Sequence, residues 1–178
     1  MWHSRPRLCA AESVSFEMQI MDVEAKRAVF RMFTYGLYAL TVPSGDEGHG
    51  ATVNWCMQTS FDPPMVAVSV EKASRTIGLL RQSGVFAINI YGADQRDLAG
   101  RLGRRFSHNP DKFRGITWSH GPTGAPVLID ALGWLECRVR NETDAGDSVV
   151  FIGEVVSAGT GRSGEPLTMG SAGFRHAG

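Results

Sequence analysis

The sequence predicts a mainly β protein, a closed antiparallel barrel with two or three peripheral helices. Six or seven short runs of apolar and β-branched residues are bounded by clusters of Gly, Pro, Asn and Asp, which is the pattern of strands and turns in small barrels. Few segments space their apolar residues as a helix does. The strand–helix alternation of a doubly wound sheet is absent, and so is a G-x-G-x-x-G motif.

The composition is that of an ordinary globular domain. The chain has 178 residues, 43% hydrophobic and 20% charged, which is enough to bury a core as one domain. Eighteen basic residues balance eighteen acidic ones, so no overall field attracts nucleic acid or an anionic membrane. No run approaches the roughly 18 apolar residues that a membrane span needs. We therefore expect neither nucleic acid nor a membrane as a partner.

Cysteine and histidine spacing gives no sign of a metal site. The three cysteines, Cys9, Cys56 and Cys137, form no C-x-x-C pair, which argues against a zinc site or a disulfide framework and favours a reducing cytoplasm. Cys137 reads as a buried hydrophobic residue in a strand. The five histidines show no ligand spacing and are expected in loops: His3, His49, His108, His120 and His176.

Three segments divide the chain. Residues 1–21 are expected to be a flexible N-terminal extension, too poor in apolar residues for a signal peptide, with Met18 or Met21 as an alternative start. Residues 22–160 are expected to form the domain. Residues 161–178, rich in Gly, Ser and Pro, are expected to be a tail that docks on a neighbour.

The first part of the domain should be a helix and a strand. Asp22 is placed to cap a short helix whose apolar residues, Val29, Met32 and Phe33, would pack on the barrel before Gly36 ends it. Leu37–Val42 reads as the first strand. Residues 43–50 are a loop by composition, expected to be a mobile hairpin tip.

The centre of the chain, residues 50–76, predicts two strands and a helix start. From Thr52 to Ser60 every second residue is small or polar, which suits one strand with two different faces. Pro63 and Pro64 form a corner. Met65–Val70 is nearly continuous in apolar and β-branched residues, as in a strand covered on both sides.

The helix after this second strand begins without a compensating acid. Ser74 is placed as its N-cap, and Arg75 and Thr76 occupy a first turn where Asp or Glu is usual. Lys72 lies just upstream, and Glu71 is the only nearby acid. Free N–H groups, hydroxyls and cations together suit a bound phosphate. An ordinary capped helix with solvated basic residues explains the same pattern.

The second half of the domain alternates strands with one helix and one long loop. Val85–Tyr91 predicts a core strand, and Asp94 is placed to cap a helix over Gln95–Leu102. Residues 103–120 form a long loop with interspersed aromatic residues, which in a compact domain is usually functional. Two further strands are expected to be joined by a hairpin at residues 141–147 and bent at Gly133 and Gly153: Val127–Arg140 and Ser148–Ala158.

Six motifs follow one another along the chain. They are Tyr35-Gly-Leu-Tyr-Ala-Leu-Thr41, Thr52-Val-Asn-Trp-Cys-Met-Gln-Thr-Ser60, Pro63-Pro64, Ser74-Arg-Thr76, Thr123-Gly-Ala-Pro-Val-Leu128 and Gly146-Asp-Ser-Val-Val-Phe-Ile-Gly-Glu-Val155. In this order and spacing they resemble the flavin reductase-like family of FMN-binding split barrels, and the match spans roughly Phe30 to Ala158. The resemblance implies a split antiparallel barrel of Greek-key type. Members of the family include reductase components of two-component flavin monooxygenases and flavoredoxin-type electron carriers.

The resemblance implies an FMN site. The backbone from Thr52 to Trp55 would run along the polar edge of the ring, where amide N–H groups stabilise negative charge on reduction. A solvated edge strand is the alternative explanation for Asn54 and Gln58, and Trp55 can shield the ring, fill the core or lie at a dimer interface. The expected flavin-contacting residues are Thr52, Val53, Asn54, Trp55, Gln58, Thr59 and Ser60, and the expected phosphate-binding residues are Lys72, Ser74, Arg75 and Thr76.

Three more residues are implied near the nicotinamide or the flavin face. In similar proteins the segment corresponding to Lys112 and Phe113 lies near the flavin, although aromatic residues here can equally pin the loop to the barrel. Ser148 stands where many NAD(P)H-using relatives carry a histidine, which argues against direct NAD(P)H use. A serine hydroxyl can still hydrogen-bond a carboxamide.

The resulting hypothesis is a homodimeric, FMN-dependent NAD(P)H:flavin reductase, with FAD as a possible substrate. Hydride transfer to flavin N5 requires position more than a catalytic side chain, so no catalytic residue and no metal are expected. A partner monooxygenase would receive the reduced flavin. The alternative is a flavoredoxin-like electron carrier reduced by a protein donor. A third reading is a barrel that binds another phosphorylated ligand or serves in assembly.

Overall fold

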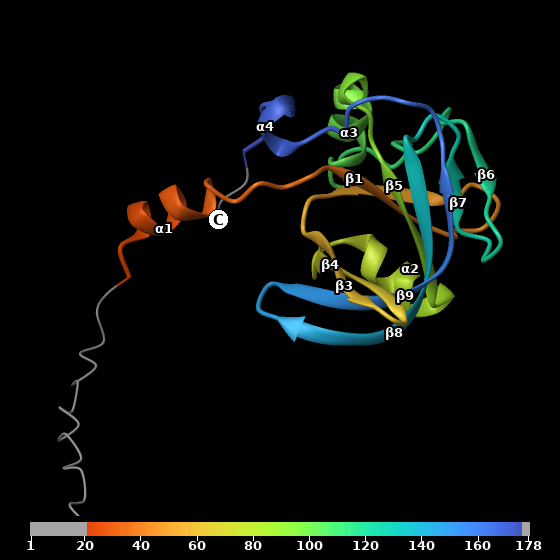
Figure 1. Cartoon of the computed structure of the whole chain (residues 1–178), viewed down its shortest axis with the longest axis horizontal. Helices are drawn as coiled ribbons and strands as arrows, with labels where there is room; N and C mark the ends of the chain where they lie inside the picture. Colours follow the sequence, from red (N-terminus) through yellow and green to blue (C-terminus); the bar gives the residue numbers. More distant parts are fainter. Residues whose placement is uncertain (1–20, 176–178) are drawn as a thin grey trace, which may run out of the picture.

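The computed structural model describes residues 21–175. The predicted N-terminal extension therefore lies outside the described residues except for Met21, as do Cys9, His3 and His176. Within the described part, nine strands, four α-helices and one 3-10 turn form the domain (Figure 1).

One antiparallel sheet of seven strands dominates the domain. Its strand order is β2-β1-β5-β8-β9-β4-β3, and β6 and β7 form a separate pair. The predicted split-barrel architecture is confirmed, but the prediction of full closure is wrong, because β2 and β3 remain as edges. The strands are β1 (Tyr38–Val42), β2 (His49–Val53), β3 (Cys56–Phe61), β4 (Pro64–Glu71), β5 (Val85–Ile90), β6 (Trp118–His120), β7 (Pro126–Leu128), β8 (Gly133–Ala145) and β9 (Ser148–Thr160).

The predicted single strand over Thr52–Ser60 is wrong. The chain leaves the β2–β1 pair after Val53 and joins β4 from Cys56 onward, so the two halves lie at opposite edges of the sheet. Asn54 and Trp55 form the crossover, where the Trp55 carbonyl accepts a hydrogen bond from the Ser69 amide at 2.9 Å. A period-two pattern continues across such a break, which is why the sequence did not reveal it.

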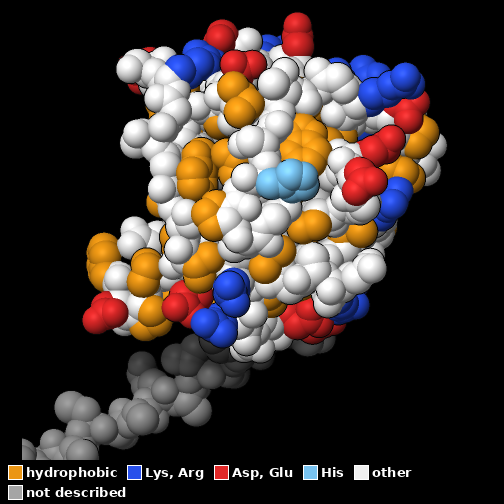
Figure 2. All heavy atoms as spheres, turned by 90° about the vertical axis from the view of Figure 1, so that its right-hand side faces the viewer, with side chains coloured by type: hydrophobic (Ala, Val, Ile, Leu, Met, Phe, Trp, Pro, Cys, Tyr) orange, Lys and Arg blue, Asp and Glu red, His pale blue; other side chains and the backbone are white. Residues whose placement is uncertain are grey.

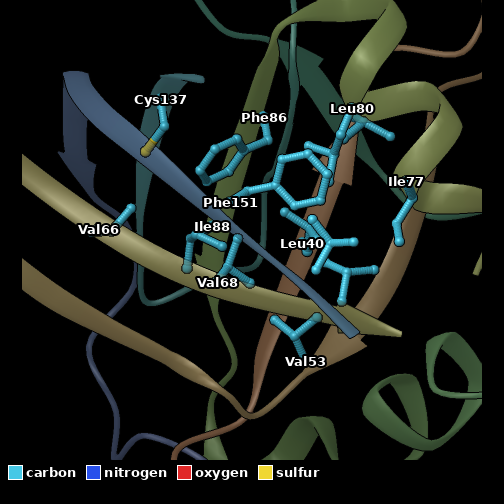
Figure 3. Packing of buried hydrophobic residues seen from close by; sticks show 13 residues of the cluster. Leu40, Val53, Val66, Val68, Ile77, Leu80, Phe86, Ile88, Cys137 and Phe151 are labelled. Atoms are coloured by element: carbon cyan, nitrogen blue, oxygen red, sulfur yellow. The ribbon is translucent and has the colours of Figure 1, made fainter. Parts of the chain in front are cut away.

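The main hydrophobic core lies between the sheet and helix α2 (Arg75–Ser83), and Figure 3 shows these side chains pointing toward one another. Phe86 and Phe151 are fully buried there. Gly153 makes room for Phe86, since a Cβ on this glycine would stand 2.5 Å from the ring. The bend predicted at Gly153 thus has a packing reason: only a residue without a side chain fits under the phenyl ring.

Helix α2 begins as the sequence predicts. Ser74 accepts a hydrogen bond from the Thr76 amide, and Gly84 ends the helix in the left-handed conformation with φ 65°. Helix α3 (Arg96–Leu102) follows a 3-10 turn, η1 (Ala93–Gln95), and has no side-chain cap. The predicted Asp94 cap is therefore wrong, because its carboxylate pairs with Arg162 instead.

The hairpin of β8 and β9 is longer than predicted. The strands pair without interruption through residues 141–145, which the sequence analysis assigned to the loop, and only Gly146 and Asp147 form the turn. Asn, Asp and Glu are rare in strands, but this end of the hairpin is exposed, so polar side chains meet no packing penalty there.

Helix α1 (Val23–Phe30) forms with the predicted Asp22 cap, which accepts hydrogen bonds from the Glu24 and Ala25 amides. It ends at Phe30 and buries none of its residues. Figure 1 shows it projecting away from the sheet, so the prediction that it packs on the barrel is wrong. Its apolar side chains, with those of Met32 and Phe33, remain exposed.

The C-terminal segment returns over its own domain. The Leu167 amide donates to the Tyr91 carbonyl and the Leu167 carbonyl accepts from the Leu37 amide, both at 2.9 Å. Leu167 is buried in a second core cluster with Tyr91 and Leu102. Helix α4 (Met169–Ala172) then lies beside α3, where Arg96 donates to the Ala172 carbonyl.

No helix in residues 21–175 is long and apolar enough to cross a membrane. On the face of the molecule that Figure 2 shows, basic and acidic side chains are interspersed around hydrophobic ones and a histidine. That face carries no extended area of one charge.

Candidate functional site

One cleft of about 840 Å³ opens where β2, the end of β4, the start of α2 and the 99–112 segment meet. The sheet supplies its floor from β2, which has a neighbouring strand on one side only. The C-terminal segment supplies another wall through Met169, Phe174 and Arg175. The cleft therefore collects residues from five separate parts of the chain.

The N-terminus of α2 faces this cleft. Ser74 and Arg75 both line it, and the first turn of the helix contains no acidic residue. Unpaired N–H groups at a helix start attract anions, and an arginine beside them adds a charged fork that matches a phosphate. The structure thus brings together the two central residues of the predicted phosphate site.

Below Ser74 lies a buried hydrogen-bonded chain. The Ser74 hydroxyl donates to Thr76 Oγ1 at 3.0 Å, and Thr76 Oγ1 lies 3.1 Å from His49 Nε2. Thr76 is fully buried and does not line the cleft, so its side chain supports Ser74 from beneath. The prediction that His49 is a loop residue is wrong, because it belongs to β2.

Burial, and then the nearby charges of Lys112 and Arg75, lower the pKa of His49 from 6.5 to about 4. The unfolded chain therefore binds more protons than the folded one between these two values, and stability should fall as the pH drops from about 6.5 through 4. We expect His49→Gln to remove this loss, which urea unfolding at several pH values measures. His120→Gln, at an exposed histidine, should keep it; equal slopes in the two variants would contradict the prediction.

Asn54 carries a polar group without a partner. It lines the cleft, and among the described residues its buried Nδ2 atom has no hydrogen-bond partner. A buried donor left unpaired costs about 1 to 3 kcal/mol, so a ligand acceptor at this point would be stabilised. This amide, at the crossover beside the edge strand, is the strongest sign of a ligand in the cleft.

The neighbours of Asn54 differ in what they can offer. Thr52 is engaged by the protein, since its hydroxyl donates to the Ala99 carbonyl at 2.7 Å and lies 2.9 Å from the Tyr91 hydroxyl. Its backbone is on the edge strand, so this is the part able to face a ligand. Val53 and Trp55 also line the cleft, and Val53 packs into the main core as well.

The long loop is held against the predicted phosphate site. The Arg75 guanidinium lies 4.2 Å above the Phe106 ring, and that ring lies 6.0 Å from His49. Lys112 donates through Nζ to the Leu102 and Arg104 carbonyls at 2.8 and 2.9 Å, and burial lowers the pKa of its ammonium to about 8. Lys112 also lines the cleft, and its hydrogen bonds fix the loop.

Besides Thr76, six other predicted site residues do not line this cleft. Phe113 is buried against Gly50, so it pins the loop to the barrel, which was the open alternative. Lys72 pairs with Asp144, and Ser148 is buried and donates to Asp147. The other three lie on β3 at the far edge of the sheet: Gln58, Thr59 and Ser60.

Sequence reasoning missed part of the cleft. Arg104, Arg105 and Phe106 line it, but only the arginine-rich composition of the loop pointed to them. Phe174 and Arg175 came from a segment expected to be a tail, and no local pattern indicates where such a segment docks. In the described residues no group of three or more His, Cys, Asp or Glu side chains could hold a metal ion.

The family model of the Flavin reductase like domain matches residues 30–178. This range includes every element that borders the cleft. It also extends past Ala158, through the C-terminal segment that supplies one wall.

Individual proteins agree with this match. The chain is 35% identical over 150 residues to the high molecular weight rubredoxin of Moorella thermoacetica, covering 83% of this chain and 64% of that protein. It is 30% identical to the reductase subunit HsaB of a flavin-dependent monooxygenase from Rhodococcus jostii, covering 84% and 75%. The chain thus spans less than two thirds of the rubredoxin.

A solved structure resembles the whole domain. BorF, the flavin reductase component of a bacterial two-component tryptophan halogenase, superposes with a TM-score of 0.75 and 33% sequence identity. The similarity covers 86% of this chain and 97% of BorF. The chain therefore shares its fold with BorF over most of the length of both proteins.

Proposed function

Since the chain belongs to the family of flavin reductase like domains, we propose that it is an NAD(P)H-dependent flavin reductase that binds FMN, accepts FAD as an alternative flavin, and supplies reduced flavin to a monooxygenase partner. The observation that carries the proposal is the cleft of about 840 Å³, which is lined both by the acid-free start of α2 and by Asn54, whose buried Nδ2 atom has no partner among the described residues. A ligand with a polar ring edge at one end and a phosphate at the other matches both.

Different residues would bind the two ends of the flavin. The α2 N–H groups, the Ser74 hydroxyl and the Arg75 guanidinium would hold the phosphate, while Asn54 would donate to an acceptor on the ring edge. The edge strand β2 would offer backbone groups along the same edge. When bound, a flavin supplies the hydride-accepting ring, and the protein supplies position and electrostatics.

His49 and Lys112 contribute to this electrostatic setting from the lining of the cleft. The lowered pKa keeps His49 neutral near pH 7, so it orients Thr76 and Ser74 without adding a charge. Lys112 ties the C-terminal end of α3 to the loop that follows it, through its hydrogen bonds to the Leu102 and Arg104 carbonyls. Both residues therefore shape the cleft from its walls.

Anaerobic mixing tests the proposal. Purified protein with bound FMN is mixed separately with NADH and with NADPH, and loss of the visible absorbance of the flavin is followed in time. We expect reduction by at least one nicotinamide. Retention of the flavin colour with both would eliminate the reductase function while leaving flavin binding intact.

A second function, a flavoredoxin-like electron carrier, is favoured by one observation. Ser148, at the position expected to face a nicotinamide, is buried and bonded to Asp147, so its hydroxyl is engaged. A carrier would keep FMN through gel filtration and would be reduced only by a protein donor. A reductase that treats flavin as a substrate would exchange it readily.

We also propose a homodimer in which α1 and the turn that follows it dock on the partner copy. Its support is the exposure of Val29 (53%), Met32 (77%) and Phe33 (55%), which no part of the described chain covers. A helix with an exposed apolar face gains stability by covering it. Met32→Lys with Phe33→Lys should shift the mass measured by light scattering from dimer to monomer, and Ile129→Lys, at another exposed apolar residue, should not. A monomeric parent protein would refute the dimer.

The free thiols support a reducing compartment. Cys56 and Cys137 are both unpaired in the structure. We propose the cytoplasm as the site of action.

A further inference from the structure

The cleft holds more positive charge than one phosphate requires. Its lining includes four arginines and one lysine but a single acidic side chain, Glu71. The phosphate of FMN carries roughly two negative charges, which the start of α2 and Arg75 are placed to meet. The other three arginines have no role in that contact: Arg175 of the C-terminal segment, and the neighbouring pair Arg104 and Arg105.

Arg104 and Arg105 have no ion-pair partner in the described part of the chain. Among residues 21–175, no carboxylate lies within ion-pair distance of either side chain, whereas Arg81, Arg140 and Arg162 are each paired with an acid. Exposed arginines with free guanidinium forks match phosphate oxygens in geometry and charge. They lie in the wall of a cleft, so their fields add over the same space.

The segment that carries them is fixed beside the first phosphate site. Phe106 follows directly in the chain and lies under Arg75 at 4.2 Å. Lys112 binds the Arg104 carbonyl at 2.9 Å and the Leu102 carbonyl at 2.8 Å. The backbone of Arg104 and Arg105 is thus held from both sides, one residue away from a ring that touches the phosphate-binding guanidinium.

The volume of the cleft allows a second phosphate group. Small-molecule sites occupy roughly 300 to 1,000 Å³, and this cleft, at about 840 Å³, lies near the upper end. A mononucleotide would not need the whole of it. A dinucleotide would place its second phosphate farther along the wall than its first.

From these observations we infer that Arg104 and Arg105 form a second phosphate subsite, which binds the adenosine phosphate of a dinucleotide. This inference rests on the proposed function, since it assigns a further contact to the same cleft. The ligand is either the adenylate half of FAD or the phosphate-bearing adenosine half of a nicotinamide dinucleotide. In either case the subsite raises affinity for the dinucleotide over FMN alone.

Titrations with flavins separate the subsite from the flavin site. Dissociation constants for FMN and FAD are measured by flavin fluorescence for the parent protein and for Arg104→Gln with Arg105→Gln. If FAD is the ligand, its dissociation constant relative to that of FMN should rise at least tenfold in the double variant. Arg114→Gln, an exposed arginine of the same loop outside the cleft lining, is the matched control and should leave the ratio unchanged.

A second experiment, steady-state kinetics, tests whether the ligand of the subsite is the nicotinamide dinucleotide. With FMN saturating, KM for NADH and NADPH is measured for the same variants. If the ligand is the nicotinamide dinucleotide, KM for at least one of the two should rise at least tenfold while the ratio of the flavin constants stays constant. Unchanged flavin ratios together with unchanged KM values would overturn the inference. Failure of the parent protein to bind FMN would instead refute the proposed function, and this inference with it.

Discussion

Arg75→Ala is expected to weaken FMN binding by about 1.5 to 3 kcal/mol, or roughly 10- to 100-fold, because it removes a charge-assisted contact to the phosphate. No acid in the first turn of α2 compensates the helix start, so the guanidinium and the N–H groups act on the same anion. The substitution also removes the cation above Phe106, which loosens the loop beside the site. Equilibrium titration with FMN measures the change.

Arg81→Ala is the matched control. Arg81 lies in the last turn of the same helix and pairs with Glu142, far from the cleft lining. It should leave FMN affinity unchanged. Ser74→Ala should weaken binding as well, although loss of the N-cap costs helix stability of about 1 kcal/mol, so affinity must be measured on folded protein. Unchanged affinity in the Ser74→Ala, Arg75→Ala double variant would contradict the phosphate site.

Local chemistry accounts for the parts of the site that the sequence predicted. Ser74 as an N-cap and the missing acid in the first turn are properties of adjacent residues, and both hold in the structure. The buried strand β4 follows from its run of β-branched residues. Such features are readable because the interactions that cause them span only a few positions.

The errors share a different origin. Where Asn54 and Trp55 cross from one sheet edge to the other depends on pairing partners far along the chain, and period-two alternation continues across the break. His49 was expected in a loop, but it lies in β2, where it is buried and hydrogen-bonded to Thr76. Asp94 had the position of a cap, yet Arg162 competes for its carboxylate from 68 residues away. Tertiary partners decided each case.

Phe86→Ala is expected to destabilise the domain by about 3 to 5 kcal/mol, which is the usual cost of removing a fully buried phenylalanine side chain. Phe86 lies directly over Gly153, which has no side chain that could fill the cavity left by the substitution. The ring also faces the core around Phe151, as Figure 3 shows. The free energy of unfolding of a whole domain is only about 5 to 15 kcal/mol, so this single substitution should remove a large share of it. Urea unfolding measures the loss.

Two comparisons decide whether the missing volume is the cause. Phe61→Ala removes the same side chain from a position that is 89% exposed, and its effect should stay within about 0.5 kcal/mol. Phe86→Leu keeps much of the volume and should recover more than half of the loss. Phe86 does not line the cleft, so FMN affinity of the folded Phe86→Ala protein should equal that of the parent. A cost below 1 kcal/mol would mean that the sheet and α2 are not held together by this core, and that the start of α2 owes its position to other contacts.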